Sequence, residues 1–351
     1  MAQQQKYLYC IADINDRKEF GPIGIGDKEK DVYSIPFRDV GLLVSNFSPV
    51  AFDSIPKDTL LLYLATHQHV NEQMMENHTV IPVKFGTIFK DDDEIEEVLK
   101  RNYPQFKDAL ERMNNKIELE VVAIWNNMDS VLKEVGEGED IKRFKGELMA
   151  KPSGATQSDG IELGKMVKSA LDEKRDRIRD EILDGLKGCA LDFIFHDLLD
   201  DTMIMNGAFL INRDKEEDFS QRIEDLNKGF REEIDFRIVG PLPPYSFSAI
   251  ELKRMDIQKI DAAKKTLELS EEPTLVEIKE AYRRLIQRFH PDKNHDNPEV
   301  QKLFEIITKA HDILTAYCRD GRYSFKEKKD FIAVNVLDKS PIGGQSLRGY
   351  G

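Results

Sequence analysis

The chain has 351 residues, of which 40% are hydrophobic and 33% charged, and its formal net charge at pH 7 is −14. This length predicts two or three domains, and the acidic charge argues against nucleic acid as the main partner. No apolar run approaches the length of a membrane span, and three widely spaced cysteines argue against a disulfide framework and a cysteine-type zinc site.

An N-terminal α+β domain is predicted over residues 1–127. Its expected elements, in chain order, are a strand at 6–12, a loop at 16–30, a hairpin of strands at 32–37 and 41–47, a helix at 57–77, an extended segment at 79–89, helices at 91–101 and 104–113, and a strand at 117–125. The apolar residues placed near one face of the first helix are Leu60, Leu61, Leu64, Val70 and Met74. Strands on both sides of helices predict a sandwich of the ferredoxin-like kind.

A second small α+β domain is predicted over residues 128–252. The glycine-rich stretch 136–160 is expected to be a mobile excursion or linker. A long and highly charged helix should follow at 161–186, with a thin apolar stripe that suits a narrow seam or a partner. The remaining elements repeat the strand, helix and strand order of the first domain, at 202–211, 216–233 and 235–239.

Two amphipathic helices joined by a short polar loop are predicted near the carboxyl end. In the first, at about 274–289, apolar residues recur every three or four positions, and beside them lie the basic residues Lys279, Arg283, Arg284 and Arg288. Pro291 fixes the end of this helix, because the residue before a proline is pushed out of the α region. Pro298 can occupy the first turn of the next helix. The two should pack as an antiparallel hairpin that displays His290-Pro291-Asp292 at its tip.

Residues 278–294 resemble helix II and the following loop of a DnaJ-type J domain, and residues 304–314 resemble its helix III. The resemblance covers about residues 259–321, inside a predicted J domain at 256–321. In that family the loop and the basic helix engage a DnaK-type chaperone and stimulate its ATPase. The resemblance therefore implies a chaperone-binding set of Lys279, Tyr282, Arg283, Arg284, His290, Pro291, Asp292, Asn294 and Phe304. His311 stands where the family usually has Tyr, so the packing of helix III is expected to differ slightly.

Two further segments, 80–89 and 240–247, resemble signatures of the gas vesicle protein family GvpF/GvpL, and the order of elements from residue 6 to 247 is similar to that family. Leu242 stands where the family usually has Trp, and Lys84 where it usually has Arg. The resemblance implies a protein of the gas vesicle assembly machinery. Such proteins associate with the small, hydrophobic shell protein and with other accessory proteins.

The segment 240–247 can also be interpreted from its residues alone. Gly240 permits a tight or left-handed turn, and three prolines then hold the chain extended. Tyr245 and Phe247 would point to the same side if the segment continued as a strand. They could form an aromatic contact surface, or they could belong to a rigid edge that seals the core of its own domain, and the second interpretation is slightly favoured.

No catalytic, cofactor or metal site can be placed from the sequence. His67 and His69 would lie on different faces of a helix, which favours ordinary helix histidines over metal ligands. The acidic run 91–94 lacks the spacing of a calcium-binding loop and is explained by the preference for negative charge at a helix N-terminus. Residues 322–351 are expected to contain a short strand at 331–337 and a flexible tail.

The sequence thus predicts a non-enzymatic gas vesicle assembly factor, with no nucleic-acid or membrane partner. The α+β domains would hold shell protein or its complexes, and the J domain would bring a DnaK-type chaperone to that client. One alternative is a general DnaJ-like co-chaperone for misfolded clients, with an unrelated client-binding body. Another is an assembly scaffold whose J domain only docks. Because the first residues lack a signal-peptide layout, we expect a cytoplasmic location at the gas vesicles of a prokaryotic cell.

Overall fold

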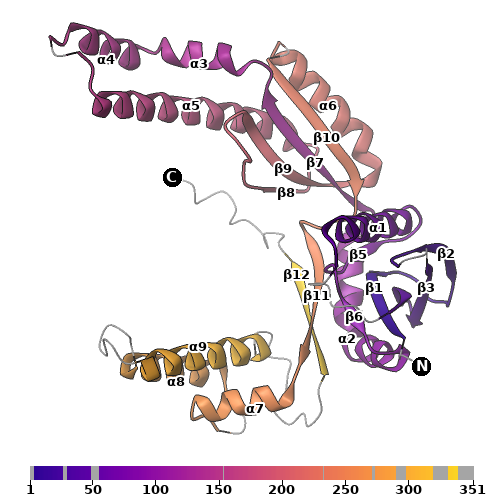
Figure 1. Ribbon diagram of the computed structural model, residues 1–351. Coiled ribbons are helices and arrows are strands. Elements are labelled where there is room, and N and C mark those ends of the chain that lie inside the picture. The colour runs from indigo at the N-terminus through magenta and orange to yellow at the C-terminus, as the bar shows by residue number, and fades with distance from the viewer. Residues whose placement is uncertain are drawn as a thin grey trace. The chain divides into compact units, whose positions relative to one another are not determined.

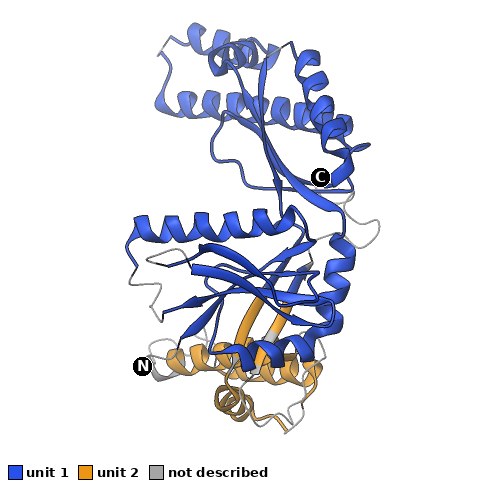
Figure 2. Cartoon of the chain, turned by 90° about the vertical axis from the view of Figure 1, so that its right-hand side faces the viewer, with its two compact units in different colours: residues 1–250, 336–351 blue, residues 251–335 orange. Residues whose placement is uncertain are grey.

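The computed structural model describes residues 4–26, 30–48, 55–152, 154–231, 233–270, 273–289, 298–318 and 331–338. The chain divides into two compact units, one of residues 1–250 and 336–351 and the other of residues 251–335 (Figure 2). Among the described residues, no helix combines the length and the apolarity that crossing a bilayer requires. The α+β class that the sequence predicts, with helices toward the carboxyl end, is confirmed.

The first sheet has six antiparallel strands in the order β2-β3-β4-β1-β5, with β6 paired to β1 (Figure 1). Its strands are β1 (Gln5–Ala12), β2 (Glu19–Gly24), β3 (Lys30–Phe37), β4 (Val40–Phe47), β5 (Val80–Pro82) and β6 (Ile88–Phe89). The predicted first strand and hairpin are confirmed. The prediction of a loop over all of 16–30 is wrong, because the segment contains β2. The Gly and Pro residues of β2 obscure the alternation of apolar and polar residues that marks a strand. Its hydrogen bonds to β3 stabilise the strand in spite of its low β-propensity.

The face predicted for helix α1 (Lys57–Met75) is confirmed at Val70 and Met74 and wrong at Leu61 and Leu64. Its buried side carries Tyr63, His67, Val70 and Met74, whereas Leu61 and Leu64 are exposed. Apolar residues surround the N-terminal half of this helix, so their spacing alone does not select one face.

Helix α2 (Asp92–Met113) is continuous, so the prediction of two helices divided at Pro104 is wrong. Its buried stripe runs past the proline from Val98 to Phe106 without a change of face. Just before the proline, the Asn102 side-chain amide donates to the Val98 carbonyl at 2.9 Å. A proline inside a helix removes one backbone hydrogen bond, and here packing of the stripe on the sheet outweighs that loss.

The second sheet has four antiparallel strands in the order β10-β7-β9-β8. The elements that build it are β7 (Lys116–Trp125), α5 (Gln157–Leu186), β8 (Asp192–Phe195), β9 (Met203–Asn212), the 3-10 turn η2 (Arg213–Lys215), α6 (Glu216–Gly229) and β10 (Ile234–Leu242). This strand order is compatible with the predicted ferredoxin-like arrangement, while the first sheet carries more strands. Strand β7 pairs with β9 and β10, so it belongs to the second sheet although it precedes the predicted boundary at residue 127.

The prediction of a mobile excursion or linker at 136–160 is wrong, because this segment is largely helical. Helices α3 (Met128–Gly136) and α4 (Glu139–Ala150) lie along α5 (Figure 1). They bury Val131, Val135 and Ile141 in the same apolar cluster as Leu171 of α5. Glycines lower helix propensity by only about 1 kcal/mol each, and this packing offsets the loss.

The second unit contains the predicted helical hairpin. Helix α7 (Ile257–Thr266) precedes α8 (Leu275–Arg288) and α9 (Pro298–Cys318), and the three share one apolar core. Both predicted helix starts are confirmed: α8 begins directly after Thr274, and α9 begins at Pro298.

Strands β11 (Ser248–Met255) and β12 (Phe331–Asp338) pair with each other in a two-stranded sheet, which we call the ribbon. The strand predicted at 331–337 is therefore confirmed. In the sequence, β11 comes just before the three helices and β12 comes after them, so the helical domain is inserted between two paired strands.

Candidate functional site

Helix α8 presents the basic residues that the sequence analysis singled out. A capping box fixes its start: the Thr274 backbone N–H donates to the Glu277 carboxylate at 2.7 Å, and the Glu277 N–H donates to the Thr274 hydroxyl at 3.3 Å. The hydrogen bond from Thr274 holds the pKa of Glu277 below its usual value. Because Ile278 and Leu285 turn into the core, the helix is rotationally fixed, and Lys279 and its basic neighbours face solvent.

The described chaperone-binding candidates differ in burial. Lys279, Arg283 and Arg284 are exposed, and Tyr282 is half-buried. Arg284 lies 3.4 Å from Glu268 in an ion pair so exposed that it contributes at most about 1 kcal/mol. Phe304 lies half-buried on α9. The four remaining candidates fall outside the described residues: His290, Pro291, Asp292 and Asn294.

His311 packs directly against this surface. Its ring stacks on that of Tyr282, with ring centroids 4.1 Å apart and planes inclined by 27°. Its two ring nitrogens lie 3.2 Å from the Asp312 carboxylate and 3.3 Å from the Thr315 hydroxyl. A flat ring at this position therefore supports Tyr282 from beneath, although it is an imidazole and not the phenol usual in the resembled family.

The first signature segment contacts strand β11, which directly follows the second signature segment in the chain. Val83 forms a parallel β-bridge with Ile250, and the Lys84 N–H donates to the Ile250 carbonyl at 2.9 Å. Phe247, the last residue of the second signature segment, is fully buried. Tyr245 is half-buried, and its burial raises the pKa of its phenol. The junction thus favours the interpretation of residues 240–247 as an edge that seals its own core.

A buried carboxylate holds this edge in place. Glu118 of β7 is almost inaccessible and accepts two hydrogen bonds at 2.8 Å, from the Ser246 N–H and from the Ser246 hydroxyl. Gly240 has φ of +142°, and a Cβ there would lie 2.7 Å from Leu119 Cδ2 and 2.9 Å from the Glu118 carbonyl oxygen, so only glycine fits. Leu242, at the position where the family usually has Trp, is buried, so this side chain contributes to the core.

Beneath the first sheet lies a buried aromatic cluster that the sequence did not reveal. Tyr7 Oη lies 3.0 Å from Nδ1 of His67 and also accepts the Gly86 N–H at 3.0 Å. The His67 ring stacks on Tyr9 at 5.8 Å between centroids. Burial lowers the pKa of His67 to about 4, so the imidazole is neutral and can accept the phenolic hydrogen. His69 is exposed on another face, as predicted.

His67 should make the first unit sensitive to acid. Its folded pKa of about 4 lies below the ordinary value of about 6.5, so its contribution to stability is complete above pH 6.5 and is lost as the pH falls toward 4. The loss should reach about 2–3 kcal/mol at the acid end. Urea unfolding at neutral and mildly acidic pH would show a smaller pH effect in His67→Gln than in the wild type. His69→Gln is the matched control and should keep the wild-type effect; an equal pH effect in His67→Gln would contradict the assignment.

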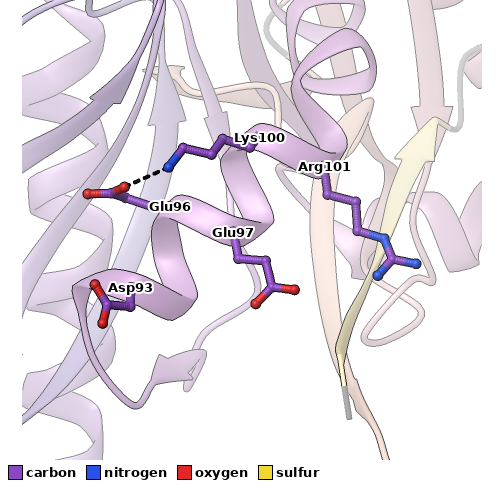
Figure 3. A pocket seen from close by; sticks show the side chains of 5 residues that line it. All are labelled: Asp93, Glu96, Glu97, Lys100 and Arg101. Carbon is purple, nitrogen blue, oxygen red and sulfur yellow. Dashed lines mark hydrogen bonds and ion pairs between the residues drawn. The ribbon is translucent and has the colours of Figure 1, made fainter. Parts of the chain in front are cut away.

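A solvent-open hollow of about 550 Å³ lies over the first turns of α2 and is lined by five charged side chains of that one helix (Figure 3). Lys100 pairs with Glu96 at 2.8 Å, as the figure shows. Just before the helix, Asp91 caps its N-terminus by accepting the Glu94 N–H at 3.0 Å, as helix-terminal charge predicts. Within the described part of the chain, no three acidic, His or Cys residues are grouped to hold a metal ion.

Two family models match the chain. The model of the gas vesicle synthesis proteins GvpL/GvpF matches residues 5–249, and the model of the DnaJ domain matches residues 265–323. Gas vesicle protein F of Nostoc sp. is 26% identical over 190 residues, which cover 53% of this chain and 77% of that protein. The chaperone protein DnaJ of Nitratiruptor sp. is 43% identical over 49 residues, which cover 14% of this chain and 13% of that protein.

The crystal structure of gas vesicle protein GvpF from Anabaena sp. has the same fold over 69% of this chain and 97% of its own length. The TM-score is 0.60 and the sequence identity 24%, so the likeness speaks for the fold alone.

Proposed function

Since the chain belongs to the gas vesicle synthesis protein GvpL/GvpF family and carries a DnaJ domain after that region, we propose that it is an accessory protein of gas vesicle assembly that recruits a DnaK-type chaperone. The GvpL/GvpF region, residues 5–249, holds shell protein or other accessory proteins. The DnaJ domain stimulates the ATPase of the chaperone on that client. In this proposal the chain works at the gas vesicles of a prokaryotic cytoplasm and is not itself an enzyme.

The observation that carries the proposal is the presence of both families in one chain. Small apolar shell subunits expose surface that aggregates in water, so a chaperone delivered to them has a physical purpose. A covalent link between a protein of the assembly family and a chaperone-recruiting domain raises the local concentration of the chaperone near the client.

The electrostatics of α8 support the same proposal. The chain carries a net charge of −14, yet Lys279, Arg283 and Arg284 face solvent together on one helix. A local positive surface on an acidic protein steers an acidic partner to that surface and disfavours other orientations. Because α8 is anchored by its capping box and its buried stripe, these charges are held in a fixed arrangement.

Capture experiments with the purified full chain test the choice of client. We expect the immobilised chain to bind gas vesicle shell protein about tenfold or more tightly than a permanently unfolded, unrelated protein. Binding should be quantified by retention of each labelled client over a range of concentrations. Equal affinity for both clients would contradict the gas vesicle assignment and favour a general DnaJ-like co-chaperone.

A further inference from the structure

An exposed apolar patch follows the edge of the second sheet. Leu191 is 52% exposed, Phe195 39%, Leu198 38% and Leu199 79%, and all four lie within nine residues of sequence, on β8 and its flanking loops. Large apolar side chains clustered at the surface and rimmed by polar groups mark interaction sites more often than scattered ones do.

Among the strands that the structure describes, β8 is the end of its sheet and pairs with β9 alone. The His196 N–H donates to the Asn206 carbonyl at 2.8 Å, which fixes the direction of the backbone groups. Because these directions alternate along a strand, the peptide groups of Phe193 and Phe195 face away from β9. The hydrogen bond of the Phe193 N–H supports this orientation, because the group donates to the Asp192 carboxylate at 2.8 Å and not to β9. The peptide groups of Phe195 are therefore directed to the open edge.

The edge is held in shape by packing. The Phe195 ring lies over Gly207, where a Cβ would come within 3.1 Å of it. It also contacts the Phe193 ring, with 5.3 Å between centroids, and the Arg179 guanidinium lies over it, 5.6 Å from its centroid. A partner strand would meet an edge that is already ordered, which lowers the entropy cost of binding.

Acidic residues alternate with the apolar residues along this stretch of the sequence, and Arg179 of α5 is a basic neighbour of Phe195. The stretch 191–202 contains four Asp and no Lys or Arg. Lys168 balances Asp201 at 2.7 Å, while hydrogen bonds from Thr202 hold the pKa of Asp200 below its usual value and keep that carboxylate ionised. Asp197 is exposed beside the apolar residues. The charge that complements this rim is positive.

We propose that the β8 edge, with Leu191, Phe195, Leu198 and Leu199, binds an extended segment of a partner protein that has apolar residues at alternate positions and basic residues between them. An open sheet edge pairs with an extended strand, whose backbone supplies the hydrogen bonds and whose alternate side chains reach the apolar patch. The acidic rim selects basic over acidic segments. This site goes beyond the proposed function and holds whether or not the client is shell protein.

A short fluorescent peptide of alternating valine and lysine is the probe, titrated with the full chain and followed by anisotropy. We expect Leu198→Ser combined with Leu199→Ser to weaken binding about tenfold, and Asp197→Lys to weaken it further. Met149→Ser is the matched control, because Met149 is 87% exposed on α4, away from β8 in the sequence, and should leave the affinity unchanged.

Two altered peptides separate the contributions. A peptide N-methylated at alternate amides should lose binding, because it cannot form the edge hydrogen bonds. A peptide with glutamate in place of lysine should bind more weakly, and the difference should shrink in high salt. Equal binding of the methylated peptide, unchanged affinity of the double Ser variant, or no binding at about 1 mM peptide would each overturn the proposal.

Discussion

Replacing His290 by Gln should reduce the stimulation of a DnaK-type chaperone to its basal ATPase rate while leaving the chain folded. His290 lies outside the described residues, and its role is inferred from the DnaJ family match at 265–323. Gln keeps the size and polarity of the side chain but removes the imidazole, so recognition should be lost without a packing change. Steady-state ATP turnover at saturating chain measures the effect, and thermal unfolding confirms the fold.

Two further variants make this test specific. His69→Gln removes an exposed imidazole from α1 and should stimulate like the wild type. Arg283→Glu combined with Arg284→Glu reverses the charge of the α8 surface. It should raise the chain concentration needed for half-maximal stimulation about tenfold at low salt and less at high salt. If His290→Gln stimulates normally, the chaperone-binding assignment is wrong.

Gly240→Ala should be the most damaging small substitution in the GvpL/GvpF region. The backbone there has φ of +142°, and the added methyl group would clash with the Leu119 side chain and with the Glu118 backbone. Backbone strain and overpacking together should cost about 2–5 kcal/mol of unfolding free energy. Trp125 is the single Trp of the chain and is buried on neighbouring β7, so its fluorescence during urea unfolding reports the loss.

The matched control is Gly164→Ala. Gly164 lies inside α5, and a Cβ there meets nothing within 4 Å. Because alanine favours helix by about 1 kcal/mol over glycine, this variant should be neutral or more stable. A Gly240→Ala chain that unfolds at the same urea concentration as the wild type would show that the strained edge relaxes freely.

The parts of the fold that were predictable are those fixed by local chemistry. Helix α8 begins after Thr274 because Thr274 and Glu277, three positions apart, form a capping box. Helix α9 begins at Pro298 because proline suits the first turn of a helix. Pro104 misled the prediction because its local preference is overruled by the packing of α2. Strands β2 and β8 were missed because their own residues carry no clear strand pattern. Hydrogen bonds to the neighbouring strands β3 and β9 stabilise them.

The candidate site shows the same division. The sequence named Lys279, Arg283 and Arg284, and the structure exposes all three on α8. Contacts between distant residues could not be predicted from one sequence, since they depend on tertiary packing. The stacking of His311 on Tyr282 and the two hydrogen bonds from Ser246 to Glu118 are such contacts.

The ribbon of β11 and β12 connects the DnaJ domain to the chain at both of its ends, and not through a single linker. In terms of polymer physics, the helical domain is a long loop whose two ends the ribbon must bring together. A folded domain holds its own termini at a fixed separation and so removes much of the closure entropy that an unfolded loop would cost. A two-stranded sheet is marginal by itself. The folding of the three helices and the pairing of β11 with β12 therefore reinforce each other thermodynamically.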